Sequence, residues 1–213
     1  MTGVRSQEVP VEPSTWPTLR ERIRSDTADW HDRVEAVAAA PSAIKSHDDY
    51  VELLSRFYEL HACFESGLAA PSLREAWGRL GIDLTAHRRA HLCAADLKSL
   101  GALPTSNPMA SPDFRTSGHA LGCLYVLEGS SLGGPIFARI VRARLGNAPT
   151  AFLSGRGRAK RTPWSSVVNA LSRFEAQGGD CDTVVDGACE TFATFATVLG
   201  RKEQARHEMT ASA

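Results

Sequence analysis

The chain has 213 residues, of which 43% are hydrophobic and 23% charged, and its 24 lysines and arginines equal its 24 aspartates and glutamates. This length and composition predict one globular domain with a sizeable core. Balanced charge provides no long-range field for capturing nucleic acid or an anionic membrane surface, so we expect neither as a partner. A local basic cluster is expected to be a solvated loop; it consists of Arg156, Arg158, Lys160 and Arg161.

The cysteines argue for a reducing compartment. Their number is odd and none is spaced C-x-x-C, which speaks against a disulfide framework and against a zinc ribbon. No apolar run approaches the length of a membrane span, and no charged-then-apolar leader opens the chain. We therefore expect a cytoplasmic protein whose cysteines are buried thiols; they are Cys63, Cys93, Cys123, Cys181 and Cys189.

Apolar residues recur at helical spacing along most of the chain. Residues 1–17 hold three prolines among polar residues and are expected to form a flexible leader. No alternating strand pattern or internal repeat is present, so residues 18–209 are predicted to form one all-α domain of seven or eight helices. The helices are expected at about 18–40, 48–69, 73–80, 85–100, 121–146, 164–177 and 182–208, with loops at 103–113 and 148–163.

The segment 121–144 combines a helical apolar pattern with an unusual number of glycines. Each glycine inside a helix costs about 1 kcal/mol relative to alanine, so the missing side chains must bring another advantage. Gly129 and Gly133 are four residues apart and clear the same helix face. That face could form a wall over a planar ligand or a small-residue surface against a neighbouring helix, and spacing alone favours the second. Pro135 should kink the helix or mark its second half.

Two of the seven histidines, His31 and His61, lie on apolar stripes. Glu35 follows His31 by one turn and could bind one ring nitrogen, which would leave the other as a metal ligand. A hydrogen-bonded core histidine is the other interpretation, and this helix alone favours it. His87 and His91 also have ligand spacing, but without the glutamate of an H-E-x-x-H motif they are expected to be solvated surface residues.

Two motifs, in the right order, resemble the heme oxygenase family. Residues 23–35 are similar to its first helix: an apolar and a basic residue, then Thr, His and an acid at the family's spacing. Residues 125–134 read YVLEGSSLGG, which is similar to the YVLEGSTLGG of the bacterial distal helix. Weaker similarities lie in residues 88–101, 152–164 and 187–192. The resemblance covers about Thr18 to Leu199 and points to the biliverdin-forming branch that accompanies bacterial phytochromes.

The resemblance implies a role for residues on both sides of a heme. His31 would be the proximal ligand of the iron, and the bare backbone at Gly129 and Gly133 would leave room for dioxygen and support ordered water. Ser130 stands where mammalian members carry an aspartate, and it is counted with these two glycines as catalytic. Further cofactor contacts are expected from Arg24 (to a propionate), Thr27, Glu35, Tyr125, Gly134 and Phe192, with Arg161 or Arg173 as candidates for a second propionate partner.

The function implied is a heme oxygenase that uses heme as substrate and cofactor and yields biliverdin, ferrous iron and carbon monoxide. Because no flavin or nicotinamide motif is present, electrons would come from outside: a ferredoxin, a reductase or ascorbate. A bacteriophytochrome would be the acceptor of the biliverdin. Two alternatives stay open, namely a non-catalytic heme or bilin carrier on the same fold and a helical interaction module.

Overall fold

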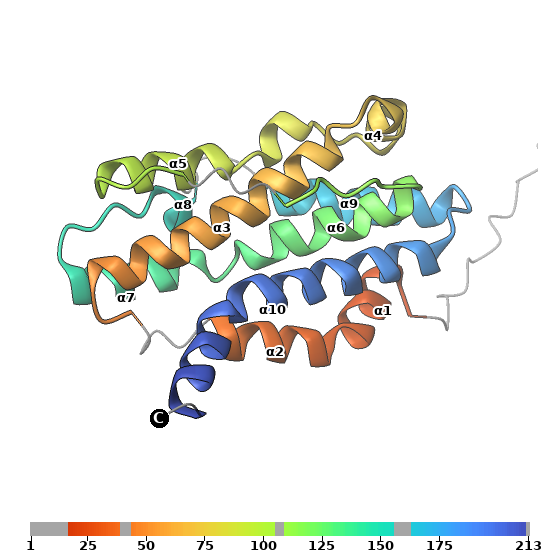
Figure 1. Cartoon of the computed structure of the whole chain (residues 1–213). Helices are drawn as coiled ribbons and strands as arrows, with labels where there is room; N and C mark the ends of the chain where they lie inside the picture. Colours follow the sequence, from red (N-terminus) through yellow and green to blue (C-terminus); the bar gives the residue numbers. More distant parts are fainter. Residues whose placement is uncertain (1–16, 39–43, 105–108, 156–162, 212–213) are drawn as a thin grey trace, which may run out of the picture.

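The computed structural model describes residues 17–38, 44–104, 109–155 and 163–211. These residues form helices and no strand, which confirms the predicted all-α class (Figure 1). Within them, no helix combines the length and apolar character needed to span a bilayer. Nearly all of the leader predicted at 1–17, and the basic cluster around residue 158, lie outside the described residues. The α-helices are α1 (Leu19–Asp26), α2 (Ala28–Ala38), α3 (His47–Leu68), α4 (Arg74–Leu80), α5 (Ala90–Ser99), α6 (Ser117–Ser130), α7 (Gly134–Leu145), α8 (Ala151–Ser154), α9 (Pro163–Ala176) and α10 (Cys181–Ala211).

The helix predicted at 18–40 is two helices, α1 and α2, separated at Thr27. Thr18 and Glu21 form a capping box at the start of α1. At its end, the Thr27 hydroxyl donates to the Ile23 carbonyl at 2.7 Å, and the Thr27 backbone N–H donates to the same oxygen at 3.0 Å. Such back-bonding bends helices, and here it turns the chain just before His31.

The helix predicted at 85–100 begins later than expected. Its first turn is the 3-10 helix η3 (Leu84–His87), and α5 begins at Ala90. The Glu65 side chain of α3 accepts the backbone N–H groups of Arg89 and Ala90 at 2.7 and 2.9 Å. This tertiary contact supplies the cap of α5, so the local sequence pattern could not place the boundary.

The glycine-rich helix is broken into α6 and α7. Ser131 N and Leu132 N donate to the carbonyls of Glu128 and Gly129, each at 3.1 Å, so the chain leaves α6 through tight i to i−3 bonds. Pro135 then lies in the first turn of α7, where its missing N–H has no intrahelical acceptor to lose. The expectation that Pro135 marks a second half is confirmed.

Part of the linker predicted at 148–163 is also helical. In α8, Phe152 and Leu153 are buried against α3, α5 and α7. The Asp96 carboxylate accepts the N–H groups of Ala151 and Phe152 at 3.0 and 2.9 Å and so supplies the N-terminal partners of this single turn. Four residues are too few to show a helical period, so this helix could not be predicted from the apolar pattern.

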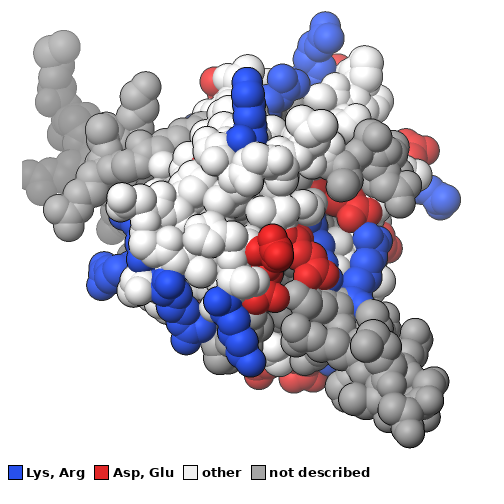
Figure 2. Space-filling model, turned by 60° about the vertical axis from the view of Figure 1, so that its left-hand side comes forward, with Lys and Arg blue, Asp and Glu red and all other residues white. Residues whose placement is uncertain are grey.

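Figure 1 shows α10 running alongside both α6 and α2, and the first half of α6 approaches α10 through glycines. A Cβ atom built on Gly122 would lie 2.0 Å from the Val184 carbonyl oxygen, and one on Gly187 would lie 2.2 Å from the His119 carbonyl oxygen. Neither distance is possible, so these backbones touch directly. On the face seen in Figure 2, basic and acidic side chains form separate small groups.

Candidate functional site

A cavity of about 730 Å³ opens where α6 passes into α7, and residues of α1, α2, α3, α8, α9 and α10 also line it. This volume lies within the roughly 300–1,000 Å³ of small-molecule and cofactor sites. Most of the wall is apolar or aromatic, as such sites require; its larger side chains are Phe57, Val126, Phe137, Ile140, Phe152, Trp164, Phe192, Phe195 and Leu199. The volume and walls suit a large, flat, mostly apolar ligand.

His31 lies on α2 at one wall of this cavity, and its side chain is 59% exposed. Its Nδ1 is 3.5 Å from Glu35 Oε1, one turn further along α2. With Nδ1 facing the carboxylate, Nε2 is the nitrogen available to a ligand. The ring also meets Phe192 of α10 edge-on, with centroids 6.1 Å apart. His31 is therefore an accessible imidazole oriented by two neighbours, and the core-histidine alternative is wrong.

Gly129 and Gly133 line the same cavity, and we call them the glycine ridge. A Cβ atom on Gly133 would meet nothing within 4 Å, and one on Gly129 would make only ordinary contacts of 3.5 and 3.8 Å with Trp164. The protein's own packing thus does not require glycine at either position. Gly134 also lines the cavity but differs, because a Cβ there would lie 2.3 Å from the Leu153 carbonyl oxygen. Packing against α8 explains this third glycine.

Two other residues singled out from the sequence border the cavity but commit their hydroxyl groups to the backbone. The Ser130 hydroxyl donates to the Leu127 carbonyl at 2.8 Å, and the buried Thr27 hydroxyl donates to Ile23. Both contacts satisfy carbonyls at the end of a helix. The structure places these residues at the site without leaving their hydroxyl protons free for a ligand.

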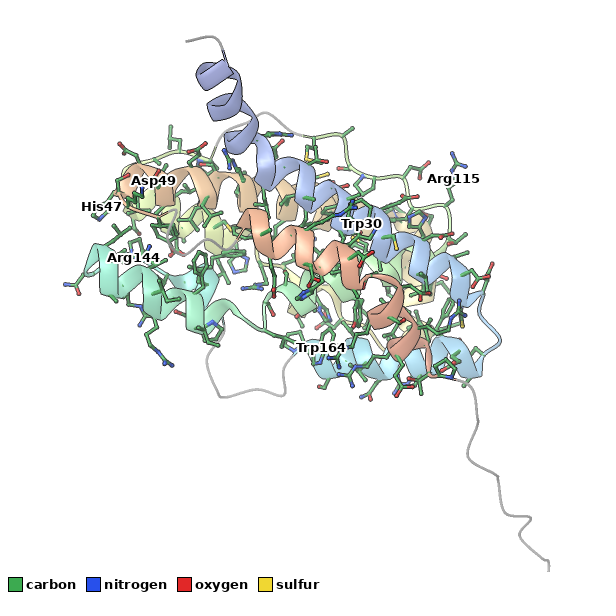
Figure 3. All side chains as sticks on the ribbon, turned by 90° about the horizontal axis from the view of Figure 1, so that it is seen from below. Trp30, His47, Asp49, Arg115, Arg144 and Trp164 are labelled. Carbon is green, nitrogen blue, oxygen red and sulfur yellow. The ribbon has the colours of Figure 1, made fainter. Side chains whose placement is uncertain are left out.

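One edge of the cavity is basic. Arg24, predicted from the sequence, lines it together with Arg20 and Tyr125. Burial raises the pKa of Tyr125, and the two arginines oppose that rise. The Arg20 guanidinium lies 5.8 Å from the Trp164 ring centre, and Tyr125 meets the same ring at 5.1 Å. Figure 3 shows Trp164 at the start of α9, and sequence reasoning missed both this residue and Arg20 because they stand outside the two motifs.

His61 is part of a buried polar cluster beside Phe152. Its place on an apolar stripe was expected, but its contacts with Phe152 and Glu65 were not predicted. His61 is only 1% exposed, stacks edge-on against Phe152 at 5.2 Å, and has Nδ1 3.4 Å from Glu65 Oε1. Burial lowers the pKa of His61. Burial pushes the pKa of Glu65 upward, but the His61 ring and the backbone N–H of Arg89 bring it below its usual value. Arg89 itself lies over the Phe152 ring at 4.7 Å and lines the cavity.

Several other predictions concern residues that do not line the cavity. His87 was predicted to be a solvated surface residue and is buried, because η3 turns it inward against α6, whereas His91 is exposed as predicted. Arg173 donates to the Leu80 carbonyl at 3.1 Å and is not among the residues that line the cavity, so it is no propionate partner. Arg161 lies outside the described residues. All five cysteines are free, in agreement with the sequence, although Cys181 and Cys189 are only partly buried.

Comparisons with solved structures identify the fold. The heme oxygenase of Neisseria meningitidis, solved in NO- and CO-bound forms, has a TM-score of 0.70 at 21% identity and covers 86% of this chain and 91% of its own. Heme oxygenase-1 of the cyanobacterium Synechocystis, solved in complex with heme, has a TM-score of 0.66 at 16% identity over 92% of this chain and 99% of its own. No family model and no curated protein matches the sequence. The chain therefore has the all-α fold seen in solved heme oxygenases.

Proposed function

We propose that this protein is a heme oxygenase, which cleaves heme with dioxygen and external electrons to biliverdin, ferrous iron and carbon monoxide. The observation that carries the proposal is that an accessible imidazole at His31 and the glycine ridge both line one mostly apolar cavity. An aromatic, side-chain-lined cavity with one free imidazole and a basic edge suits a porphyrin with an axial ligand and anionic propionates.

The residues present fit heme. His31 Nε2 would hold the iron, and Glu35, facing Nδ1, would keep the ring oriented and raise its basicity. Arg24 and Arg20 would hold the propionates at the basic edge, because an arginine fork suits a carboxylate. Phe192 and Phe195 of α10 would contact the apolar part of the ring. When bound, heme supplies the iron that activates dioxygen and the porphyrin carbon that is oxidised.

The protein's contribution is then position and exclusion. The glycine ridge keeps the far side of the cavity clear of side chains, so a small molecule has room between the ring and α6. With a ring bound, the aromatic walls would shield its apolar part from bulk water, which strengthens each polar contact inside. Electrons would come from a ferredoxin, a reductase or ascorbate. The five free thiols suit a reducing compartment such as the cytoplasm, and a bacteriophytochrome is the proposed biliverdin acceptor.

The test follows the pigment. Protein mixed with one equivalent of hemin should develop a Soret band, and ascorbate in air should convert it to a bilin spectrum with release of carbon monoxide. Catalase is included so that free peroxide cannot attack the ring. Protein that binds no hemin, or that binds it only with a spectrum identical to hemin in buffer, would reject the proposal and leave the helical interaction module, which predicts a stable complex instead.

One observation favours a second candidate, a heme or bilin carrier on the same fold. The residue after the first ridge glycine is Ser130, whose hydroxyl is bonded to the Leu127 carbonyl and so is not a free proton donor in the cavity. A carrier needs no such donor. A full Soret band that survives both ascorbate and a ferredoxin system, without bilin, would select the carrier.

A further inference from the structure

A buried ion-pair partnership lies behind the glycine ridge, outside the cavity. Glu128 is the residue before Gly129 on α6, and its Oε1 is 2.8 Å from Nδ1 of His87, the last residue of η3. Both side chains are only 4% exposed. Charged or titratable groups this deeply buried are costly unless they are paired and hydrogen-bonded, so the pair has a purpose other than stability alone.

A third element closes the partnership. Ser166 of α9 places Oγ 3.2 Å from His87 Nε2, and the same hydroxyl donates to the Pro163 carbonyl at 2.7 Å. Because the hydroxyl has one proton and gives it to Pro163, it accepts the N–H of His87 Nε2. The other ring nitrogen, Nδ1, faces the Glu128 carboxyl, so both nitrogens of this buried ring have a hydrogen-bond partner.

A serine, a histidine and a carboxylate in this order also make up the nucleophile and base of hydrolases. A hydrolytic role needs space for a substrate beside the histidine. The small cavity that His87 lines is about 10 Å³, which holds at most one water molecule. The three side chains are thus a structural contact among α6, α9 and η3, and we call them the His87 brace.

The brace holds the parts of the cavity that need support. On α6 it acts at Glu128, directly before the ridge, where the helix ends in tight turns and has poor propensity. On α9 it acts two residues after Trp164, the side chain nearest to Gly129. On the η3 side it acts two residues before Arg89, which lines the cavity. One buried contact therefore fixes the ridge, its aromatic neighbour and the cavity's guanidinium together.

We propose that Glu128 and His87 are positioning residues for the oxidation, because their buried contact with Ser166 sets the distance and tilt of the glycine ridge over the bound ring. This inference rests on the proposed function. The two residues act through Gly129 and Arg89 and do not touch the substrate. Loss of the brace should therefore leave hemin binding and His31 ligation intact and disturb what happens on the ridge side of the ring.

The experiment compares Glu128→Ala with Glu128→Gln, which keeps a hydrogen bond to His87. For Glu128→Ala we expect kcat to fall about tenfold to a hundredfold, the range for reacting groups misplaced by up to 1 Å, while the KM for hemin changes little. The C–O stretching band of the ferrous carbon monoxide complex should shift or broaden, and the mixture of biliverdin isomers should widen. Glu128→Gln should restore the band and most of the rate.

The chain offers a matched control on the same helix. His119 of α6 meets Glu190 of α10 at 2.9 Å, but this pair is 25% and 71% exposed and borders no part of the cavity. Glu190→Ala should leave kcat, the carbon monoxide band and the isomer mixture unchanged. If Glu128→Ala fails to fold, the double variant His87→Phe with Glu128→Met removes both partners, which is often tolerated, and the same readouts apply.

The outcomes separate the two proposals. Wild-type protein that does not bind or oxidise hemin rejects the proposed function, whatever the variants do. Active wild-type protein with Glu128→Ala or the double variant equal to it in kcat, carbon monoxide band and isomer mixture overturns the positioning role. Equal losses in Glu190→Ala would also overturn it, because the effect would then belong to α6 in general.

Discussion

The two ends of α6 both carry glycines, and they use them differently. Gly122 lies against α10, where a Cβ would be 2.0 Å from the Val184 carbonyl oxygen. Gly133, just beyond the other end, has nothing within 4 Å of where its Cβ would be. The first position needs glycine so that two helix backbones can touch, whereas nothing in the protein itself demands glycine at the second.

This difference teaches how to distinguish a packing glycine from a binding glycine. A packing glycine has protein atoms inside the space of its absent side chain, and a binding glycine has an empty cavity there. Gly134 belongs to the first kind although it follows Gly133 directly, since α8 occupies its space. Gly118 and Gly122 are four residues apart, as are Gly129 and Gly133, so spacing does not distinguish the two kinds. Only the atoms around each glycine distinguish them.

The largest effect is expected at the packed end. Gly122→Ala would place a methyl group against backbone atoms of Val184, which cannot move aside as a flexible side chain could. The substitution should lower the free energy of unfolding by about 3 kcal/mol or more. Urea unfolding measures it. Gly187→Ala should behave alike from the α10 side, because its Cβ meets the His119 carbonyl oxygen at 2.2 Å. An unchanged free energy of unfolding in both variants would mean that the α6 and α10 backbones do not touch here.

At Gly133, adding a side chain should leave the stability of the fold nearly unchanged but weaken ligand binding. Gly133 lines the cavity and a Cβ there would meet nothing within 4 Å, so for Gly133→Leu we expect an unfolding free energy within about 0.5 kcal/mol of wild type. Hemin affinity should fall at least about a hundredfold, or about 2.7 kcal/mol, because the side chain occupies the ligand's space. A hemin titration beside a urea curve checks both. Normal affinity would show that the ligand does not reach the ridge.

Acid should weaken the cavity side of the molecule through His61. Burial lowers its folded pKa, so below about pH 6.5 the unfolded chain takes up a proton that the folded chain refuses. Above pH 6.5 protonation of His61 therefore costs no stability, and below it the free energy of unfolding falls by up to about 1.4 kcal/mol per pH unit. The free energy of unfolding, measured from urea curves at pH 7.5, 6.5 and 5.5, should depend less on pH for His61→Phe than for wild type. Parallel curves for the two proteins would contradict this account.

A smaller effect is expected at the basic edge. Arg24→Gln removes one proposed propionate partner and should weaken hemin binding by about 1 kcal/mol, since the arginine is exposed. The loss should vanish with hemin dimethyl ester, which has no propionate charge. Arg33→Gln is the matched control, because Arg33 lies over Trp30, 4.9 Å from the ring centre, and does not line the cavity. An equal loss with the ester would show that Arg24 does not act through a propionate charge.

Periodicity and the two motifs predicted much of this molecule. The all-α class, the ends of the helices predicted at 48–69 and 73–80, and the presence of His31, Gly129 and Gly133 at one cavity all follow from local pattern or from the resemblance. What failed depends on contacts distant in sequence. The start of α5 is set by Glu65, twenty-five residues earlier, and α8 depends on Asp96.

The site shows the same division. Trp164, Arg20 and Arg89 border the cavity because the fold brings α9, α1 and the residue before α5 to it, which no spacing along the chain encodes. His87 looked like a surface residue because two arginines follow it, yet Glu128 and Ser166 draw it inside. A signal was present in the glutamate before Gly129, since a buried carboxylate on an apolar helix needs a partner. The identity of that partner could not be read from the sequence.

The central claim, that His31 holds a ligand beneath the glycine ridge, is tested most directly by restoring the imidazole from solution. Hemin bound to His31→Ala should lose the Soret position of the wild-type complex and regain it when free imidazole is added, because the small molecule fits the vacated space. His91→Ala, an exposed histidine outside the cavity, should keep the wild-type spectrum throughout. A His31→Ala complex that is spectrally identical to wild type before any imidazole is added would contradict the claim.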